Sequence, residues 1–228
     1  MSVEVAAGVV LIVAPLWFNA TFVALAKRFD YPDILRRPTA EILERFEAGG
    51  SPLIMLWWAF TMSGLLLIGA VVLLGQVLGD SRLLPLAVVA GVLAGLVQIL
   101  GLLRWVYLVP PLAHTYADPS VGDGERTAVI VTFRAFHQYL GVGVGEHLGY
   151  LLTGLWSLLV GIAVLSSSQV AHWLAWPGIV MGIGLIVGSA EFLGPNERGG
   201  WPTAGKAVPL LYIGWSLWLV AMGIALLA

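Results

Sequence analysis

Residues 83–109 read LLPLAVVAGVLAGLVQILGLLRWVYLV and contain a single charged residue, Arg104. The hydrocarbon core of a bilayer is about 30 Å thick, so a helix needs about 20 apolar residues to cross it. Backbone groups inside lipid cannot bond to water, which makes a helix the expected structure of so long an apolar run. This stretch therefore predicts a transmembrane helix.

Five more segments have the same character, and none of them shows the strict alternation of a transmembrane strand. We expect an all-α bundle of six spans that forms a single transmembrane domain over residues 1–228. The predicted spans are approximately residues 5–26, 53–79, 83–109, 139–165, 172–193 and 207–227.

The composition excludes several classes of protein. Hydrophobic residues make up 59% of the chain and charged residues 11%, against about 25% charged residues in soluble domains. The net charge of −2 argues against nucleic-acid binding, which needs a basic surface. The chain has no cysteine, so disulfides, thiolate nucleophiles and thiolate metal sites are excluded, and the redox compartment stays undetermined.

Two connections between the spans have patterns of their own. Residues 30–48, DYPDILRRPTAEILERFEA, place apolar side chains between charges, which predicts an amphipathic helix on the membrane surface; an ordinary charged loop is the alternative. Residues 123–138 run directly into the fourth span, so this helix must protrude, lie flat or break at Gly141, Gly143 and Gly145. Pro110 and Pro111 are expected to end the third span.

Basic residues predict the orientation, because they are enriched in cytoplasmic connections. One face carries nine of them, and Arg82 stands alone on the other. The nine are Lys27, Arg28, Arg36, Arg37, Arg45, Arg126, Arg134, Arg198 and Lys206. We therefore expect both termini to face outward.

Glycines spaced four residues apart allow close helix packing. Gly91 and Gly95, Gly178 and Gly182, and Gly141, Gly145 and Gly149 follow this pattern. Packing within one subunit is the favoured interpretation, and a homo-oligomer interface is the alternative.

Ionisable residues inside membrane spans are costly and usually mark a functional site. Arg104 lies near the cytoplasmic end of the third span, and Glu146 and His147 lie at a similar depth in the fourth. Because a buried carboxylate needs a partner or a proton, Arg104 is the expected partner of Glu146. Arg134, His137 and Gln138 share a face at the mouth of the fourth span. The candidate ligand-binding residues are Arg104, Tyr107, Arg134, His137, Glu146, His147 and Glu191.

The absent motifs leave the cofactor unknown. The chain has no phosphate-binding loop, zinc-protease motif or serine nucleophile elbow. His137 and His147 lie too far apart on one helix to hold one haem. Metal binding by Glu146 and His147 with a third group has only generic support, so we predict no metal site.

The runs LGLLRWVYLVPPL (100–112) and FRAFHQYLGVGVGEHLGYLLTGLW (133–156) resemble a bacterial family of six-helix membrane proteins known only as a domain of unknown function. The resemblance covers about residues 50–228. It implies six helices and a bacterial plasma (inner) membrane, and it implies no activity, substrate or cofactor.

Three functions fit these residues. The first is binding or transport of a small amphipathic or anionic molecule, such as a lipid headgroup or a quinone, in a cytoplasm-facing pocket. The second is an intramembrane enzyme in which Glu146 or His147 is the general base and Arg104 stabilises negative charge. The third is a structural partner subunit in which the ions lock the bundle. Membrane lipids are partners in all three.

Overall fold

Leucine, valine, alanine and glycine dominate the long apolar segments, and a computed structural model shows them as helices. It describes residues 2–79 and 81–228 and contains no strand within those ranges. Six helices of the described chain are long and apolar enough to cross a membrane, which confirms the predicted fold class. They are Val3–Phe29, Thr39–Val77, Leu84–Ala117, Asp123–Val164, His172–Phe192 and Pro202–Leu227.

Several of these helices are composed of shorter elements. The main helices are α1 (Val3–Phe29), α2 (Thr39–Thr61), α3 (Ser63–Val77), α4 (Leu84–Leu103), α5 (Val109–Ala117), α6 (Asp123–Phe136), α7 (Gly149–Val164), α8 (Ala175–Gly188) and α9 (Pro202–Leu227). Two π-helical segments join them, η2 (Arg104–Leu108) and η3 (His137–Leu148). Short 3-10 turns are η1 (Asp33–Arg36), η4 (His172–Leu174), η5 (Ser189–Phe192) and η6 (Gly194–Asn196).

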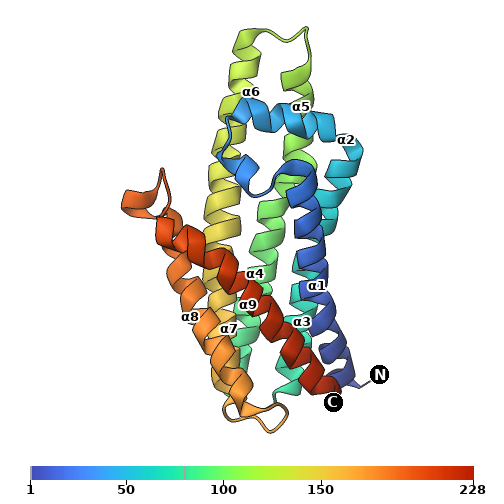
Figure 1. Cartoon of the computed structure of the whole chain (residues 1–228), viewed down its shortest axis with the longest axis vertical. Helices are drawn as coiled ribbons and strands as arrows, with labels where there is room; N and C mark the ends of the chain where they lie inside the picture. The colour runs from blue at the N-terminus through green and yellow to red at the C-terminus, as the bar shows by residue number, and fades with distance from the viewer. Residues whose placement is uncertain (1, 80) are drawn as a thin grey trace.

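The membrane-length helices close into a ring. Along it α1 contacts α3, α3 contacts α4, α4 contacts α7, α7 contacts α8, α8 contacts α9, and α9 returns to α1. The two chain ends lie at the same end of the bundle (Figure 1). The connections that carry the nine basic residues therefore lie at the opposite end.

Glycines allow these helices to approach closely within the chain. A Cβ on Gly154 of α7 would lie 2.7 Å from the carbonyl oxygen of Gly182 on α8. A Cβ on Gly91 would lie 2.6 Å from the ring of Trp156. Trp156, Trp215 and Trp218 are buried in the apolar core at this level. The spaced glycines thus pack against neighbouring helices of the same chain.

The amphipathic helix after the first span is present as the first half of α2. The backbone turns at Gly50, which has φ 53° and ψ −157°, a conformation open essentially only to glycine. The half before this turn lies across the bundle (Figure 1). Its apolar residues Ile42, Leu43 and Phe46 are buried against the protein, so this face packs on the bundle end instead of entering lipid.

The prolines do not end the third span, which corrects the sequence-based expectation. The helix passes through η2, where the Val109 N–H bonds to the Arg104 carbonyl five residues back. Pro110 and Pro111 then occupy the first turn of α5, directly after this wider turn. The helix continues to Ala117.

The helix of the fourth span is longer than a bilayer is thick, and its first part protrudes from the bundle. Gly141, Gly143 and Gly145 do not break the helix but lie within η3, which continues α6 into α7. As a result α5 and α6 extend together beyond α2 (Figure 1).

Candidate functional site

A small cavity lies between η3 and η5, at the end of the bundle away from the termini. Its volume is about 120 Å³, which is room for several water-sized groups. The lining residues are Gln138, Val142, Gly143, Glu146, His147, Tyr150, Ser189, Glu191, Phe192 and Leu193. We call it the Glu146 pocket.

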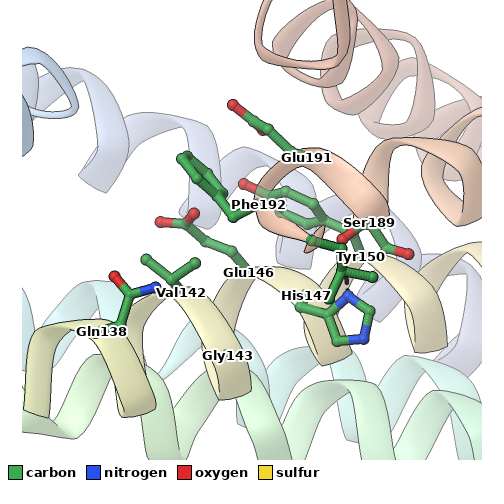
Figure 2. Close-up of a pocket in the computed structure, with 10 residues that line it drawn as sticks. Gln138, Val142, Gly143, Glu146, His147, Tyr150, Ser189, Glu191 and Phe192 are labelled. Carbon is green, nitrogen blue, oxygen red and sulfur yellow. Dashed lines mark hydrogen bonds between the residues drawn. The ribbon is translucent and has the colours of Figure 1, made fainter. Parts of the chain in front are cut away.

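One face of the fourth span supplies four of the ten lining residues. Gln138, Val142, Glu146 and Tyr150 follow one another at intervals of four residues, which places them along one side of η3 and the start of α7. Phe192 lies over the Glu146 side chain, and Glu191 points away from it (Figure 2). No hydrogen bond or ion pair joins the Glu146 carboxylate to another described residue, so its oxygens are open to a group in the pocket.

His147 connects the two walls of the pocket. Its Nδ1 lies 2.7 Å from the carbonyl oxygen of Ser189. A carbonyl only accepts, so Nδ1 carries the proton and donates it. The backbone carbonyl of Glu191 in turn accepts from the Trp201 N–H at 2.7 Å. The first bond holds η5 against η3, and the second ties η5 to the start of α9.

Arg104 is buried beside this pocket but does not line it. Only 7% of the residue is exposed. Its Nη1 donates to the Gly101 carbonyl oxygen, and its Cζ lies 5.3 Å from the centre of the Trp105 ring. The expected ion pair is not formed: within the described chain, no Glu146 oxygen lies within 4.0 Å of the guanidinium. The two charges attract each other across a longer gap.

Tyr31 is influenced by the charges of both Arg104 and Glu146, and the sequence alone did not point to it. Burial and, to a smaller extent, the Glu146 charge raise the pKa of the Tyr31 hydroxyl, and the Arg104 charge lowers it, so that this pKa is about 12. The hydroxyl therefore lies within the field of both groups. The Tyr31 ring packs edge-on against Trp57 at 5.1 Å. An aromatic residue within the charged stretch 30–48 was the only signal for it.

The three polar residues at the mouth of the fourth span make three different sets of contacts. Gln138 lines the pocket. His137 stacks on Phe133 with ring centres 5.5 Å apart. Arg134 is exposed and donates from Nε to Thr39 Oγ1 at 3.2 Å, which ties α6 to the start of α2.

The structure thus separates the seven candidate residues. Glu146, His147 and Glu191 line one pocket. Arg104 and His137 belong to a neighbouring buried cluster around Trp105. Arg134 bonds to α2, and Tyr107 is 72% exposed on the outer surface of the bundle. Among the described residues, no group of three or more His, Asp or Glu side chains is arranged to hold a metal ion.

Polar contacts continue from the pocket into the bundle. Tyr150 packs against Tyr212 of α9, with ring centres 5.5 Å apart. One turn deeper, the Gln98 amide donates to Thr153 Oγ1 at 3.2 Å. These contacts link α4, α7 and α9 in the half of the bundle that holds the pocket.

A closed ring of six apolar helices, with ionisable side chains buried at one end, defines a multi-pass α-helical membrane protein. The chain belongs to the family described as a domain of unknown function (DUF4386), which matches residues 6–223. This match confirms the family resemblance and extends it over the first span. Searches of curated proteins and of solved structures gave no match.

Proposed function

We propose that this membrane protein binds the polar end of a small amphipathic molecule in the Glu146 pocket. The observation that carries the proposal is the Glu146 carboxylate, which faces the pocket without a protein partner. A charge within a membrane span is expensive unless something pairs with it. A ligand group that donates hydrogen bonds or carries positive charge supplies the pairing.

The lining favours a donating or cationic group, such as a primary amine. The Glu146 carboxylate, when ionised, only accepts hydrogen bonds, and the Nδ1 proton of His147 is already used by Ser189. The apolar remainder of the ligand would leave the pocket past Val142, Phe192 and Leu193.

An anionic headgroup is less well suited to this pocket than the sequence suggested. No lysine or arginine is among the lining residues. Arg36 attracts both carboxylates, but its side chain is 78% exposed and lies 3.8 Å from Asp33. A second carboxylate or phosphate would therefore meet Glu146 and Glu191 without a buried counter-charge.

We further propose that the pocket faces the cytoplasm of a bacterial cell, across its plasma (inner) membrane, and that both termini lie outside. The support for the orientation is the placement of nine basic residues in the connections at the pocket end. The bacterial membrane follows from the family resemblance.

Binding of a radiolabelled alkylamine to the protein in lipid nanodiscs tests the proposed ligand class. Saturable binding should be at least tenfold weaker in Glu146→Gln, because a charge-assisted hydrogen bond is worth about 1.5–3 kcal/mol. Glu44→Gln, which changes an exposed acid on α2, is the matched control and should bind normally. Equal binding by the two variants, or saturable binding of the alkyl carboxylate of the same length instead, would refute the proposal.

A further inference from the structure

Four buried nitrogens in a second cluster have no hydrogen-bond partner among the described residues. They are Nε of Arg104, Nε1 of Trp57, Nε1 of Trp105 and Nδ1 of His137. Arg104 is 7% exposed, and both tryptophans are 0% exposed. Buried polar groups in native proteins are nearly always bonded, so each exception requires an explanation.

These nitrogens belong to side chains that surround the Trp105 indole. The Trp57 ring stacks on it, with centres 4.6 Å apart and planes 9° apart. The His137 ring lies 6.4 Å from it, and the Arg104 Cζ lies 5.3 Å from it. Three separate elements, α2, η2 and η3, therefore bring side chains with unpaired nitrogens together around one indole ring.

The guanidinium is far from satisfied by the protein. It has five N–H donors, and among the described residues one of them makes a hydrogen bond, from Nη1 to the Gly101 carbonyl. Its Nη2 lies against the bare backbone of Gly141, where a Cβ would be 2.7 Å away. Glu146, the acid expected to pair with Arg104, faces the neighbouring pocket. A buried positive charge is costly without a bonded negative partner.

We propose that the Arg104 cluster is an anion-binding site, which takes the oxygens of a phosphate group. A planar guanidinium matches a phosphate in two-point geometry, and indole N–H groups can only donate, which excludes a cationic ligand at the same point. The phosphate comes either from a free anion or from a lipid headgroup. Phe46 of α2 stacks on Trp105 at 5.8 Å, so the segment before Gly50 covers the site and must move for entry.

Two conservative variants test this proposal in the purified full-length protein. Arg104→Gln removes the charge, and Trp105→Phe removes only one N–H while it keeps an aromatic ring. The probes are inorganic phosphate and a water-soluble short-chain phosphatidic acid, each titrated while the midpoint of thermal unfolding is followed. We expect apparent affinity to fall about tenfold or more in Arg104→Gln and about threefold to tenfold in Trp105→Phe.

Matched controls separate this site from general effects. Arg28→Gln changes an exposed arginine at the same end of the bundle, and Trp176→Phe changes a tryptophan that is 61% exposed; both should respond as wild type does. If Arg104→Gln does not fold, Trp105→Phe decides the question. Stabilisation by inorganic phosphate identifies a free anion, and stabilisation by phosphatidic acid alone identifies a headgroup.

Two results would overturn the proposal: no response of the wild type to either probe, or the same response in Trp105→Phe and Trp176→Phe. Alkylamine binding, measured on the same preparations, should be unchanged in Trp105→Phe. Failure of the proposed anion site can therefore be distinguished from failure of the proposed function at Glu146.

Discussion

The guanidinium of Arg104 occupies the space in which a side chain at position 141 would lie. A Cβ on Gly141 would be 2.7 Å from Nη2 and 2.9 Å from Cζ of Arg104, which is closer than non-bonded atoms approach. The close contact joins η2 to η3, the two π-helical segments of the bundle. The backbone φ at position 141 is ordinary, so any residue could adopt it. Glycine is required there because the buried Arg104 side chain fills the space of a Cβ.

Gly141→Ala should destabilise the protein by forcing this guanidinium to move. Overpacking of a filled interior costs about 1–3 kcal/mol. Gly124→Ala is the matched control, because Gly124 is also helical and nothing lies within 4 Å of its Cβ position, so the gain in helix propensity is common to both. The midpoint of thermal unfolding in detergent measures the difference. Equal unfolding midpoints of the two variants would show that the guanidinium can move aside without loss of stability.

His147→Ala should loosen η5, because it leaves the Ser189 carbonyl without the donor that lies 2.7 Å away. An unsatisfied buried acceptor costs about 1–3 kcal/mol. His147→Asn keeps an amide N–H close to the position of Nδ1 and should restore most of the loss. Amide hydrogen exchange of residues 189–193 reports the opening directly. Unchanged exchange in the alanine variant would show that the bond does not hold η5.

The spans were predictable from the sequence, and the two π-helical segments were not. Hydropathy identifies 83–109 because lipid excludes charge over a whole helix length. No local sequence pattern predicts the π-helical turn at Arg104–Leu108. For the same reason Pro110 and Pro111 were misread as a helix end.

The sequence pointed to three of the residues that line the cavity, Glu146, His147 and Glu191, and grouped them with four residues that lie elsewhere. Burial cost alone selects Arg104 and Glu146 from the spans. Glu146 faces the cavity, whereas Arg104 lies in the neighbouring cluster. This separation depends on the sides of η3 on which the two side chains lie. Tyr31 could not be predicted because it lies in a connection between spans. Only the folded chain brings its hydroxyl under the influence of the Arg104 and Glu146 charges.

Tyr31 should make stability fall at high pH. Its pKa is about 12 in the folded protein, above the usual value of about 10, so folding favours the neutral phenol. This contribution is fully present below pH 10 and is lost as the pH rises from about 10 to about 12. Tyr31→Phe should flatten the decline in unfolding midpoint over that window, while Tyr107→Phe, which removes a phenol that is 72% exposed, should follow wild type. The ultraviolet absorbance of tyrosinate provides an independent check, since wild type minus Tyr31→Phe should show one phenol ionising near pH 12.

Single-cysteine labelling decides the proposed orientation, and the cysteine-free chain makes the experiment clean. Ser120→Cys places a thiol in the connection between α5 and α6, and Ser168→Cys places one between α7 and η4; both serines are exposed. If basic connections face the cytoplasm, a membrane-impermeant maleimide added to intact cells should label Ser168→Cys and leave Ser120→Cys unlabelled. Inverted vesicles should give the opposite pattern. His137→Cys should label from the Ser120 side but more slowly, because His137 Nδ1 is buried. Labelling of Ser120→Cys in intact cells would reverse the orientation and put the Glu146 pocket on the outer side, with the fold unchanged.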